Sequence, residues 1–424
     1  MELAAPVASE PRYKVHDETG REVVVREHGR NGDRVITLLP DGQLGYPSRL
    51  ISTEEPFVPL TLAEMRQRLE NGPYRGYRIY ESKHYLIFAM CSDYFAKGSR
   101  TLLENLYSKL TAGLKDRGLE VHETEFPLVA VIFATEREFR AHREVAADVQ
   151  AYYEIDSNRI FFYETADQGG DNPALALRKP QTVAHEGTHQ ILSNVGVQPR
   201  LAPWPLWLIE GFAEFCSPAT TTKKNTVDWA GLGKINALHM ATIHDLYDQA
   251  ALQYNGSGQP PPPRDPTRPL IPQIVRSVDL SPTDYALSWA LVHYLANKRK
   301  DEFWSYLKLM SKLEPLSTRT PDQQLTDFRL AFPGDPIKLE KAMRTYLGKI
   351  NFVAPPYYFV MFAQPIPGNM IRRAAMVSQS LSAIDEWIQR ITAADGGQPQ
   401  WQLMPHGTRT SAAQAAEVWM REGQ

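Results

Sequence analysis

The chain has 424 residues, which is enough for two or three domains, and its apolar fraction of 43% can supply a full hydrophobic core. The formal net charge of −3 gives no electrostatic basis for binding nucleic acid, so we expect no nucleic-acid partner. No apolar run reaches the roughly 18 residues of a membrane-spanning helix, which predicts that no segment spans a membrane.

Residues 1–11 are expected to form a disordered tail, as chain ends often do when nothing ties them down. They lack the basic region followed by an apolar core that marks a signal peptide. Their alanine, proline and serine content nevertheless resembles the stretch that follows a removed signal. We therefore expect an exported protein, periplasmic or secreted, whose signal is absent from this chain, with a cytoplasmic protein as the alternative.

Residues 12–59 are predicted to form a small β-barrel or meander. Two β-rich runs, at 22–26 and 34–39, are each followed by a turn that contains glycine. No aromatic or basic cluster marks a binding face in this region. We therefore expect this small domain to cover the larger one that follows it.

Residues 60–163 combine helical and strand patterns. Thr61 with Glu64, and Thr135 with Glu138, have the spacing of capping boxes at helix starts. A longer helix is expected at 96–118, where leucines recur at helical spacing. Strands are expected at 77–80, 84–89, 128–134, 152–153 and 159–163. The pattern predicts an α+β fold with a mixed sheet.

The sequence His185-Glu186-Gly187-Thr188-His189 follows this sheet pattern. In a helix, His185 and His189 project from one face and can bind one metal ion. Glu186 can then reach a water on that metal and act as its general base. Two histidines at this spacing also occur on solvated helix faces, but the surrounding run VAHEGTHQIL is too apolar for that. We therefore predict one zinc ion on this helix.

A second helix is expected at 207–215, WLIEGFAEF, after a chain break that contains Pro203 and Pro205. A catalytic zinc usually has three protein ligands and one open position. Glu210 and Glu214 are four residues apart and share a helix face. We interpret Glu210 as the third zinc ligand, and Glu214 as the acceptor for the outer nitrogen of a zinc-bound histidine. The two active-site helices together span about 181–217.

HEGTHQIL followed by WLIEGFAEF resembles the gluzincin metallopeptidases, in which an HExxH helix and a later glutamate helix hold one zinc ion. Within that group the chain is most similar, over about 80–347, to bacterial proteins grouped as DUF1570, near the peptidase MA-like proteins. The resemblance includes 152–153 and 158–160 before the motif and 285–295 after it. It implies a mainly helical zincin-like metallopeptidase domain at 60–349.

The resemblance carries over residue by residue. It implies that His185, His189 and Glu210 bind zinc and that Glu186 is the catalytic base. It also implies a sheet edge strand beside the cleft that pairs with extended substrate, for which 160–163 is our candidate.

Related enzymes place a tyrosine or histidine opposite the zinc to stabilise the oxyanion. Tyr285, at the start of a helix expected at 279–300, is our first candidate for that residue and His293 is the second. For both residues, packing in the core is the alternative.

Several other features are predicted to be structural. His239 and His244 lie five apart in a helix expected at 232–248, which is poor spacing for one face, so neither is expected to bind the metal. The segment 166–172 reads as a loop near the site, and 256–269 as a proline-rich linker.

Residues 350–424 fall beyond the resemblance and are expected to form a C-terminal accessory segment. A strand is expected at 357–362, with helices at 369–391 and near 412–420. The two cysteines of the chain, Cys91 and Cys216, either pair or remain buried thiols.

The expected function is a zinc-dependent peptidase acting on a peptide or polypeptide. Endopeptidase action is favoured, because the GxMxN-type segment of the best-known gluzincin aminopeptidases is missing. One alternative is a zinc-binding scaffold or pseudo-peptidase, which would not need Glu186. Another is a metal-dependent hydrolase of a non-protein amide, such as a cell-wall crosslink. A long open groove would favour polypeptide, and a short closed pocket would favour a small amide.

Overall fold

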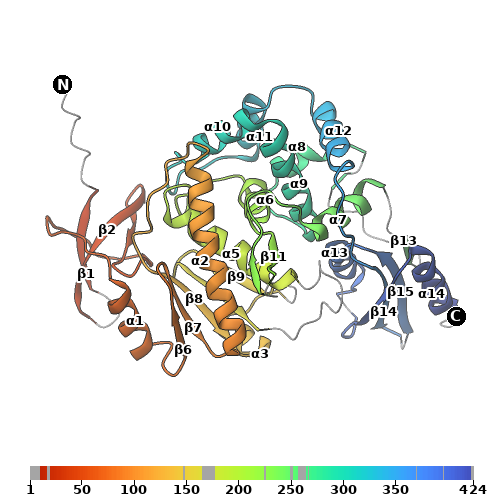
Figure 1. Cartoon of the computed structure of the whole chain (residues 1–424), viewed down its shortest axis with the longest axis horizontal. Helices are drawn as coiled ribbons and strands as arrows, with labels where there is room; N and C mark the ends of the chain where they lie inside the picture. Colours follow the sequence, from red (N-terminus) through yellow and green to blue (C-terminus); the bar gives the residue numbers. More distant parts are fainter. Residues whose placement is uncertain are drawn as a thin grey trace.

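The computed structural model describes residues 10–16, 20–146, 149–164, 177–223, 226–248, 252–255, 264–265, 267–368, 370–394 and 396–421. Within these ranges the chain has an α+β fold with an N-terminal β region, as predicted (Figure 1). No helix in them is both long and apolar enough to cross a membrane. The predicted loop at 166–172, most of the predicted linker at 256–269, and 1–9 of the predicted tail lie outside the described residues.

The N-terminal region is a five-stranded antiparallel sheet in the order β4-β3-β2-β1-β5. Its strands are β1 Arg12–His16, β2 Glu22–Asn31, β3 Arg34–Leu38, β4 Leu44–Gly45 and β5 Ile51–Ser52. Tyr13, Val15, Val25 and Val35 form its small core. The sheet contacts the larger part of the molecule at His28, whose Nε2 lies 2.9 Å from the carbonyl oxygen of Arg200. It therefore covers one end of that part, as Figure 1 shows at the left.

The central sheet has the order β6-β7-β8-β10-β9. Its strands are β6 Arg78–Glu81, β7 Tyr85–Ala89, β8 Leu128–Phe133, β10 Arg159–Tyr163 and β9 Ala151–Glu154. The three inner strands are parallel, and β6 and β9 pair antiparallel at the two edges. The prediction that 160–163 is the edge strand is wrong, because β10 lies between β8 and β9. The edge strand on that side of the sheet is β9.

Both faces of the central sheet are covered, which explains its continuous runs of buried residues. Alternate side chains of β7, β8 and β10 enter two separate cores. One core includes the long helix α2 (Asp93–Lys115), and the other includes α1 (Leu62–Asn71) and α3 (Glu136–His142). Both predicted capping boxes are present, at Thr61 and at Thr135.

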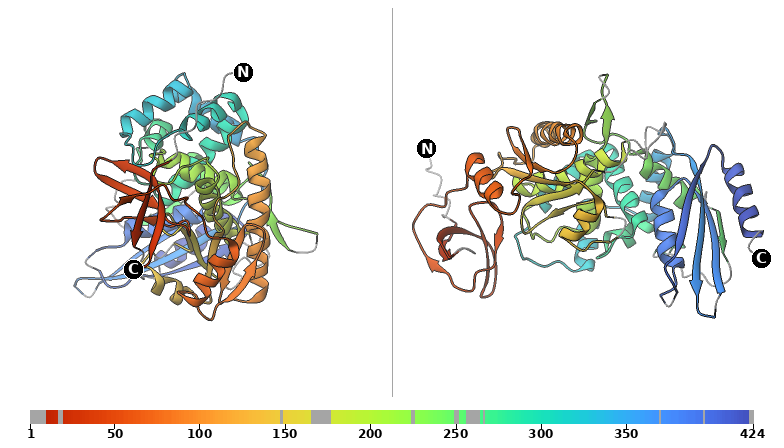
Figure 2. Two further views of the ribbon diagram at one scale, coloured as in Figure 1. Left: turned by 90° about the vertical axis from the view of Figure 1, so that its left-hand side faces the viewer. Right: turned by 90° about the horizontal axis from the view of Figure 1, so that it is seen from below.

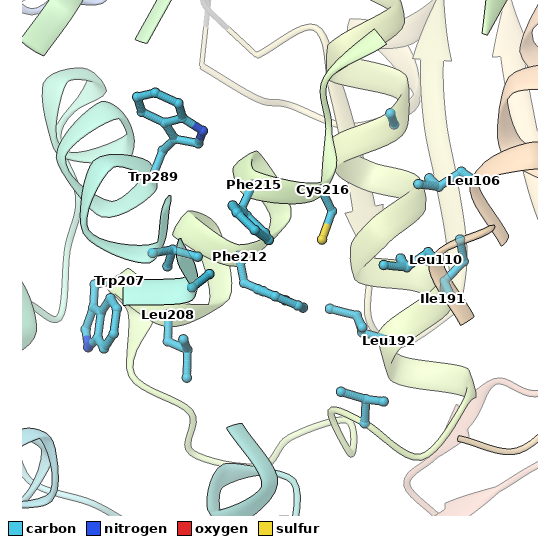
Figure 3. Packing of buried hydrophobic residues seen from close by; sticks show 14 of the residues in the cluster. Leu106, Leu110, Ile191, Leu192, Trp207, Leu208, Phe212, Phe215, Cys216 and Trp289 are labelled. Atoms are coloured by element: carbon cyan, nitrogen blue, oxygen red, sulfur yellow. The ribbon is translucent and has the colours of Figure 1, made fainter. Parts of the chain in front are cut away.

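The helical half of the molecule is arranged around α9, which is buried along nearly its whole length. Its helices are α5 Arg178–Asn194, α6 Leu206–Cys216, α7 Ala237–Asp248, α8 Leu270–Val275, α9 Pro282–Lys298, α10 Lys300–Met310, α11 Pro321–Ala331 and α12 Pro336–Leu347. Figure 3 shows aromatic residues of α6 packed among leucine and isoleucine side chains of α2 and α5. A short antiparallel hairpin, β11 Ala219–Thr221 and β12 Val227–Trp229, follows α6.

Helices α6 and α9 touch closely at Gly211. A Cβ atom at this position would lie 2.5 Å from the backbone oxygen of Ser288. We expect Gly211→Ala to destabilise the protein by about 2 kcal/mol, because overpacking against rigid backbone outweighs the better helix propensity of alanine. Chemical denaturation measures the difference. Gly98→Ala in α2 is the control, since a Cβ there meets nothing within 4 Å; an equal effect of both changes would contradict this explanation.

The C-terminal segment forms a second layered unit, visible at the right of the right-hand view in Figure 2. Its antiparallel sheet has the order β13-β15-β14-β16, with strands β13 Leu252–Asn255, β15 Met370–Ser378, β14 Tyr357–Ile366 and β16 Gln400–His406. Helix α13 (Leu381–Ile391) packs on one face and α14 (Arg409–Arg421) on the other. The sheet includes β13, which lies about 100 residues earlier in the chain.

The helix expected at 369–391 is wrong over its first half, because 370–378 is the strand β15. The second half of β15, Ala374–Ser378, is buried without interruption, since α13 and α14 cover opposite faces of the sheet. A continuous apolar run of this length does not distinguish a strand from a buried helix by its periodicity. The run becomes a strand because it pairs with β13 and β14, and β13 lies far from it in the sequence.

Candidate metal centre

Helix α5 places His185 and His189 on one face and packs its other side into the core. Val183, Ala184, Ile191 and Leu192 are buried there. Gly187 allows close contact with α2, since a Cβ atom at 187 would lie 2.6 Å from Cδ2 of Leu103. The helix begins at Arg178, a few residues before the expected start near 181. Core packing on one side thus fixes the direction of the two histidines on the other.

Helix α6 brings Glu210 to the same place. The helix begins at Leu206, directly after Pro205, and buries Trp207, Leu208, Phe212 and Phe215. Gly211 lets α6 pack closely against α9, and Glu210 is the residue directly before this contact. Glu210 is half-buried and faces the two histidines.

Three potential ligand atoms converge at this point. Nε2 of His185 lies 3.0 Å from Nε2 of His189 and 3.1 Å from Oε2 of Glu210. Nε2 of His189 lies 3.4 Å from the same carboxylate oxygen. Ligands at about 2.0 to 2.1 Å from a tetrahedral zinc lie about 3.3 Å from one another, so this donor set fits zinc in size and chemistry. The three residues are those interpreted as ligands from their spacing.

The electrostatics of the centre are those of a cation site. Burial alone would lower the pKa of His185, but the charge of Glu214 and hydrogen bonds with Glu210 and Glu214 raise that pKa well above its usual value. Burial alone would raise the pKa of Glu210, but the neighbouring His189 and His185 lower it to about 2. In the absence of a metal, a proton therefore supplies the positive charge that these side chains require.

Glu214 lies behind His185, at the distance expected of an outer partner. Its Oε1 is 3.1 Å from Nδ1 of His185, the nitrogen that faces away from the three converging atoms. Its Oε2 is 2.8 Å from Nε2 of His239 in α7. His239 is a residue that the sequence did not single out for a role. Its contact with Glu214 joins two helices that are distant in the sequence, so no spacing along the chain indicates it.

Glu186 lies beside the centre and contacts the sheet edge. Its Oε2 accepts a hydrogen bond of 2.7 Å from the backbone N–H of Tyr153 in β9. Because β9 is an edge strand, some of its backbone groups have no strand partner and are available for such contacts. The edge strand and the candidate base therefore meet directly.

These residues line a cleft of about 660 Å³. One wall is the β9 region, including 149–153 and Ile155. Another wall comes from the first turns of α13, with Leu381, Ser382 and Asp385. The C-terminal segment, which the sequence predicts only as an accessory segment, thus borders the metal centre.

The two candidates for the oxyanion-binding residue have different locations. Tyr285 lines the cleft, and its ring centre lies 6.4 Å from that of His185. His293 lies in the core, where Nε2 is 3.2 Å from the oxygen of Gly233 and Nδ1 is 3.2 Å from the hydroxyl of Tyr346. The structure therefore supports packing, and not catalysis, for His293.

The location of His293 predicts a pH effect on stability. Burial lowers its folded-state pKa to about 4, whereas an unfolded histidine titrates near about 6.5. The contribution of neutral His293 to the free energy of unfolding is complete above the unfolded pKa. This contribution, up to about 3 kcal/mol, is lost as the pH falls from about 6.5 to 4. Urea unfolding at pH 7 and pH 4.5 measures this loss. His293→Gln should show a smaller loss, and an equal loss in both proteins would contradict the assignment.

Cys91 and Cys216 are both buried, unpaired thiols. Burial raises the pKa of Cys91 to about 11 and that of Cys216 well above its usual value. Both groups are therefore neutral thiols near neutral pH, and the metal centre does not include them.

Comparison with known proteins gives one family match. Residues 180–317 match the family described as "Protein of unknown function (DUF1570)". The matched part includes α5, α6 and Tyr285, so it contains the three converging side chains and the neighbouring Glu186. No curated protein sequence matches the chain.

Proposed function

We propose that the protein is a zinc-dependent peptidase of the gluzincin type, with His185, His189 and Glu210 as the metal ligands. The observation that carries the proposal is the convergence of the three ligand atoms, all within 4.8 Å of one another, beside Glu186 and a sheet edge. A buried cluster of ion pairs alone would not need an additional carboxylate facing the cleft. A zinc ion held there would supply Lewis-acid polarisation of a carbonyl and a water of lowered pKa.

Glu186 is the general base in this proposal. Its carboxylate takes one proton from the attacking water while the oxygen of that water forms a bond to the scissile carbonyl carbon. Glu186 then gives the proton to the leaving nitrogen as the C–N bond breaks. The N–H of Tyr153 holds one carboxylate oxygen at 2.7 Å, which leaves the other oxygen for the proton. Tyr285 donates a hydrogen bond to the developing oxyanion from across the cleft.

The substrate in this proposal is an extended peptide. The wall formed by β9 offers backbone N–H and C=O groups that can pair with a peptide as an additional strand. Side chains at 149–153 line the same wall, so a substrate would contact several consecutive residues. This continuous wall favours a polypeptide over a small amide, and we favour internal cleavage over trimming of chain ends.

A library of peptides of mixed sequence tests this function. The zinc-loaded protein is expected to cut within the peptides, and mass spectrometry locates the cuts. Cuts confined to one terminus would replace endopeptidase with exopeptidase action. If zinc is bound and no peptide is cut, hydrolysis of a non-protein amide or a zinc-binding scaffold becomes the better account.

A change in the α13 wall of the cleft is expected to affect substrate binding without affecting zinc binding. Ser382→Trp should fill part of the cleft and lower kcat/KM for a peptide substrate by about tenfold, mainly through KM. Bound zinc should stay unchanged, because Ser382 lines the cleft without belonging to the three converging ligands. Gln389→Trp, on the exposed side of α13, is the control. Equal kinetics for both variants would show that α13 does not contact substrate.

A further inference from the structure

Behind the candidate ligands, a buried chain of polar groups extends from α5 through α6 to α7. It runs from Nδ1 of His185 to Oε1 of Glu214 at 3.1 Å, and from Oε2 of Glu214 to Nε2 of His239 at 2.8 Å. We propose that His239 is a positioning residue of the metal centre, which acts on His185 through Glu214. The inference rests on the metal site of the proposed function but not on any peptidase activity.

The orientation of His239 is fixed by its surroundings. Oδ1 of Asn236 accepts hydrogen bonds from the backbone N–H groups of Leu238 and His239, at 3.1 and 3.2 Å, and so fixes the first turn of α7. On the other side, the ring of Trp289 lies 5.7 Å from the His239 ring. His239 is 8% exposed, so its position is set by packing and not by solvent.

Glu214 receives contacts on both of its oxygens. Oε2 lies near three groups, namely His239 at 2.8 Å, the amide of Asn236 at 3.4 Å and the hydroxyl of Ser217 at 3.3 Å. Of these, the His239 contact is the shortest. This contact at 2.8 Å holds the carboxylate in the rotamer that places Oε1 at 3.1 Å from Nδ1 of His185.

The effect of this arrangement reaches the metal through the His185 ring. With the ring proton on Nδ1, which lies 3.1 Å from Oε1 of Glu214, Nε2 of His185 keeps its lone pair and faces His189 and Glu210. Without His239, the buried carboxylate of Glu214 loses its shortest partner and can rotate away from His185. The ring of His185 is then less well oriented, and its Nε2 is a weaker ligand.

His244 provides a matched comparison on the same helix. It lies five residues after His239 and points to another part of the molecule, where its ring contacts Phe352 at 5.3 Å. A change at His244 therefore alters α7 without touching Glu214. This separates an effect on the metal centre from an effect on the helix.

The test measures zinc affinity of the full chain by competition with a chromophoric chelator. His239→Leu is expected to weaken zinc binding about tenfold, in the range seen when outer partners of metal ligands are removed. His239→Gln, whose side-chain amide can take the place of Nε2 beside Glu214, should stay within about threefold of the original affinity. His244→Leu should bind zinc as the unchanged protein does. The absorption spectrum of the Co²⁺-substituted protein should change in His239→Leu and return in His239→Gln.

A double-mutant cycle with Glu214→Gln decides whether His239 acts through Glu214. We expect His239→Leu to add little to the loss already caused by Glu214→Gln. A full tenfold loss in both backgrounds, or unchanged zinc affinity in His239→Leu, would overturn the proposal. Cleavage is not measured here, so a protein that binds zinc but cuts nothing would refute the peptidase proposal and still test His239.

Discussion

Replacing Glu186 by glutamine is expected to lower kcat/KM for peptide cleavage by about a thousandfold, which is within the usual contribution of a general base. Glutamine has nearly the same shape, and its carbonyl oxygen can still accept the N–H of Tyr153. It cannot take a proton from water. The expected loss therefore comes from chemistry and not from a change in the fold, and steady-state kinetics on a cleaved peptide measures it.

Two controls accompany the Glu186→Gln variant. Its zinc content should equal that of the unchanged protein, since Glu186 is not one of the three converging ligand residues. Glu154→Gln, on the same edge strand as Tyr153, changes a carboxylate that contacts Arg143 and Ser157, outside the three converging ligands and the cleft lining, and should leave cleavage unchanged. A Glu186→Gln protein that keeps more than about a tenth of its activity would contradict the assigned role.

Replacing Glu210 by glutamine is expected to weaken zinc binding by at least about a hundredfold. A complete set of zinc ligands contributes roughly 10 kcal/mol or more, so the loss of one anionic ligand removes several kcal/mol. The low pKa of Glu210, about 2, means that its charge is present throughout the physiological range. Chelator competition measures the affinity, and elemental analysis of the purified protein measures the metal content.

Thermal unfolding provides an independent test of Glu210 as a zinc ligand. Zinc at about a hundred times its dissociation constant stabilises the folded state by about 2.7 kcal/mol, because it binds the folded state and not the unfolded one. The unchanged protein should therefore melt at a higher temperature with zinc, and Glu210→Gln should show a much smaller shift. Full zinc occupancy and a full shift in Glu210→Gln would remove Glu210 from the ligand set.

An ion-pair cluster without a metal is the simplest rival for the centre. The residues His185, Glu210 and Glu214 do attract one another, and their pKa values show this. A cluster that served stability alone would gain little, because burial of charged groups costs about as much as their attraction returns. The Nε2 atoms of the two histidines lie 3.0 Å apart, a separation that either one shared proton or one shared cation can bridge, and zinc binding distinguishes the two.

The parts of the fold that depend on local sequence could be predicted, and those that depend on distant contacts could not. The capping boxes at Thr61 and Thr135 and the helix around His185 follow from residues a few positions apart. The place of β9 at the sheet edge depends on which strands pair, and alternation within a strand does not encode that. For the same reason, the sequence predicts a helix where the structure has the strand β15.

The candidate site shows the same division. Spacing alone suggested His185, His189 and Glu210, because i, i+4 pairs and an apolar helix face are local features. The contact of His239 with Glu214 joins α6 to α7, and the α13 wall joins 381–385 to a centre almost 200 residues earlier in the chain. Such contacts exist only after the helices have packed around α9.

The central claim is that one bound zinc ion makes this protein a peptidase, and a zinc titration of the metal-free protein tests it most directly. Bound zinc and the rate of peptide cleavage are measured on the same samples. We predict that the rate rises in proportion to bound zinc and reaches its maximum at one ion per chain, and that chelator abolishes it. Cleavage that persists in the metal-free protein, or a fully zinc-loaded protein that cuts no peptide, would contradict the claim.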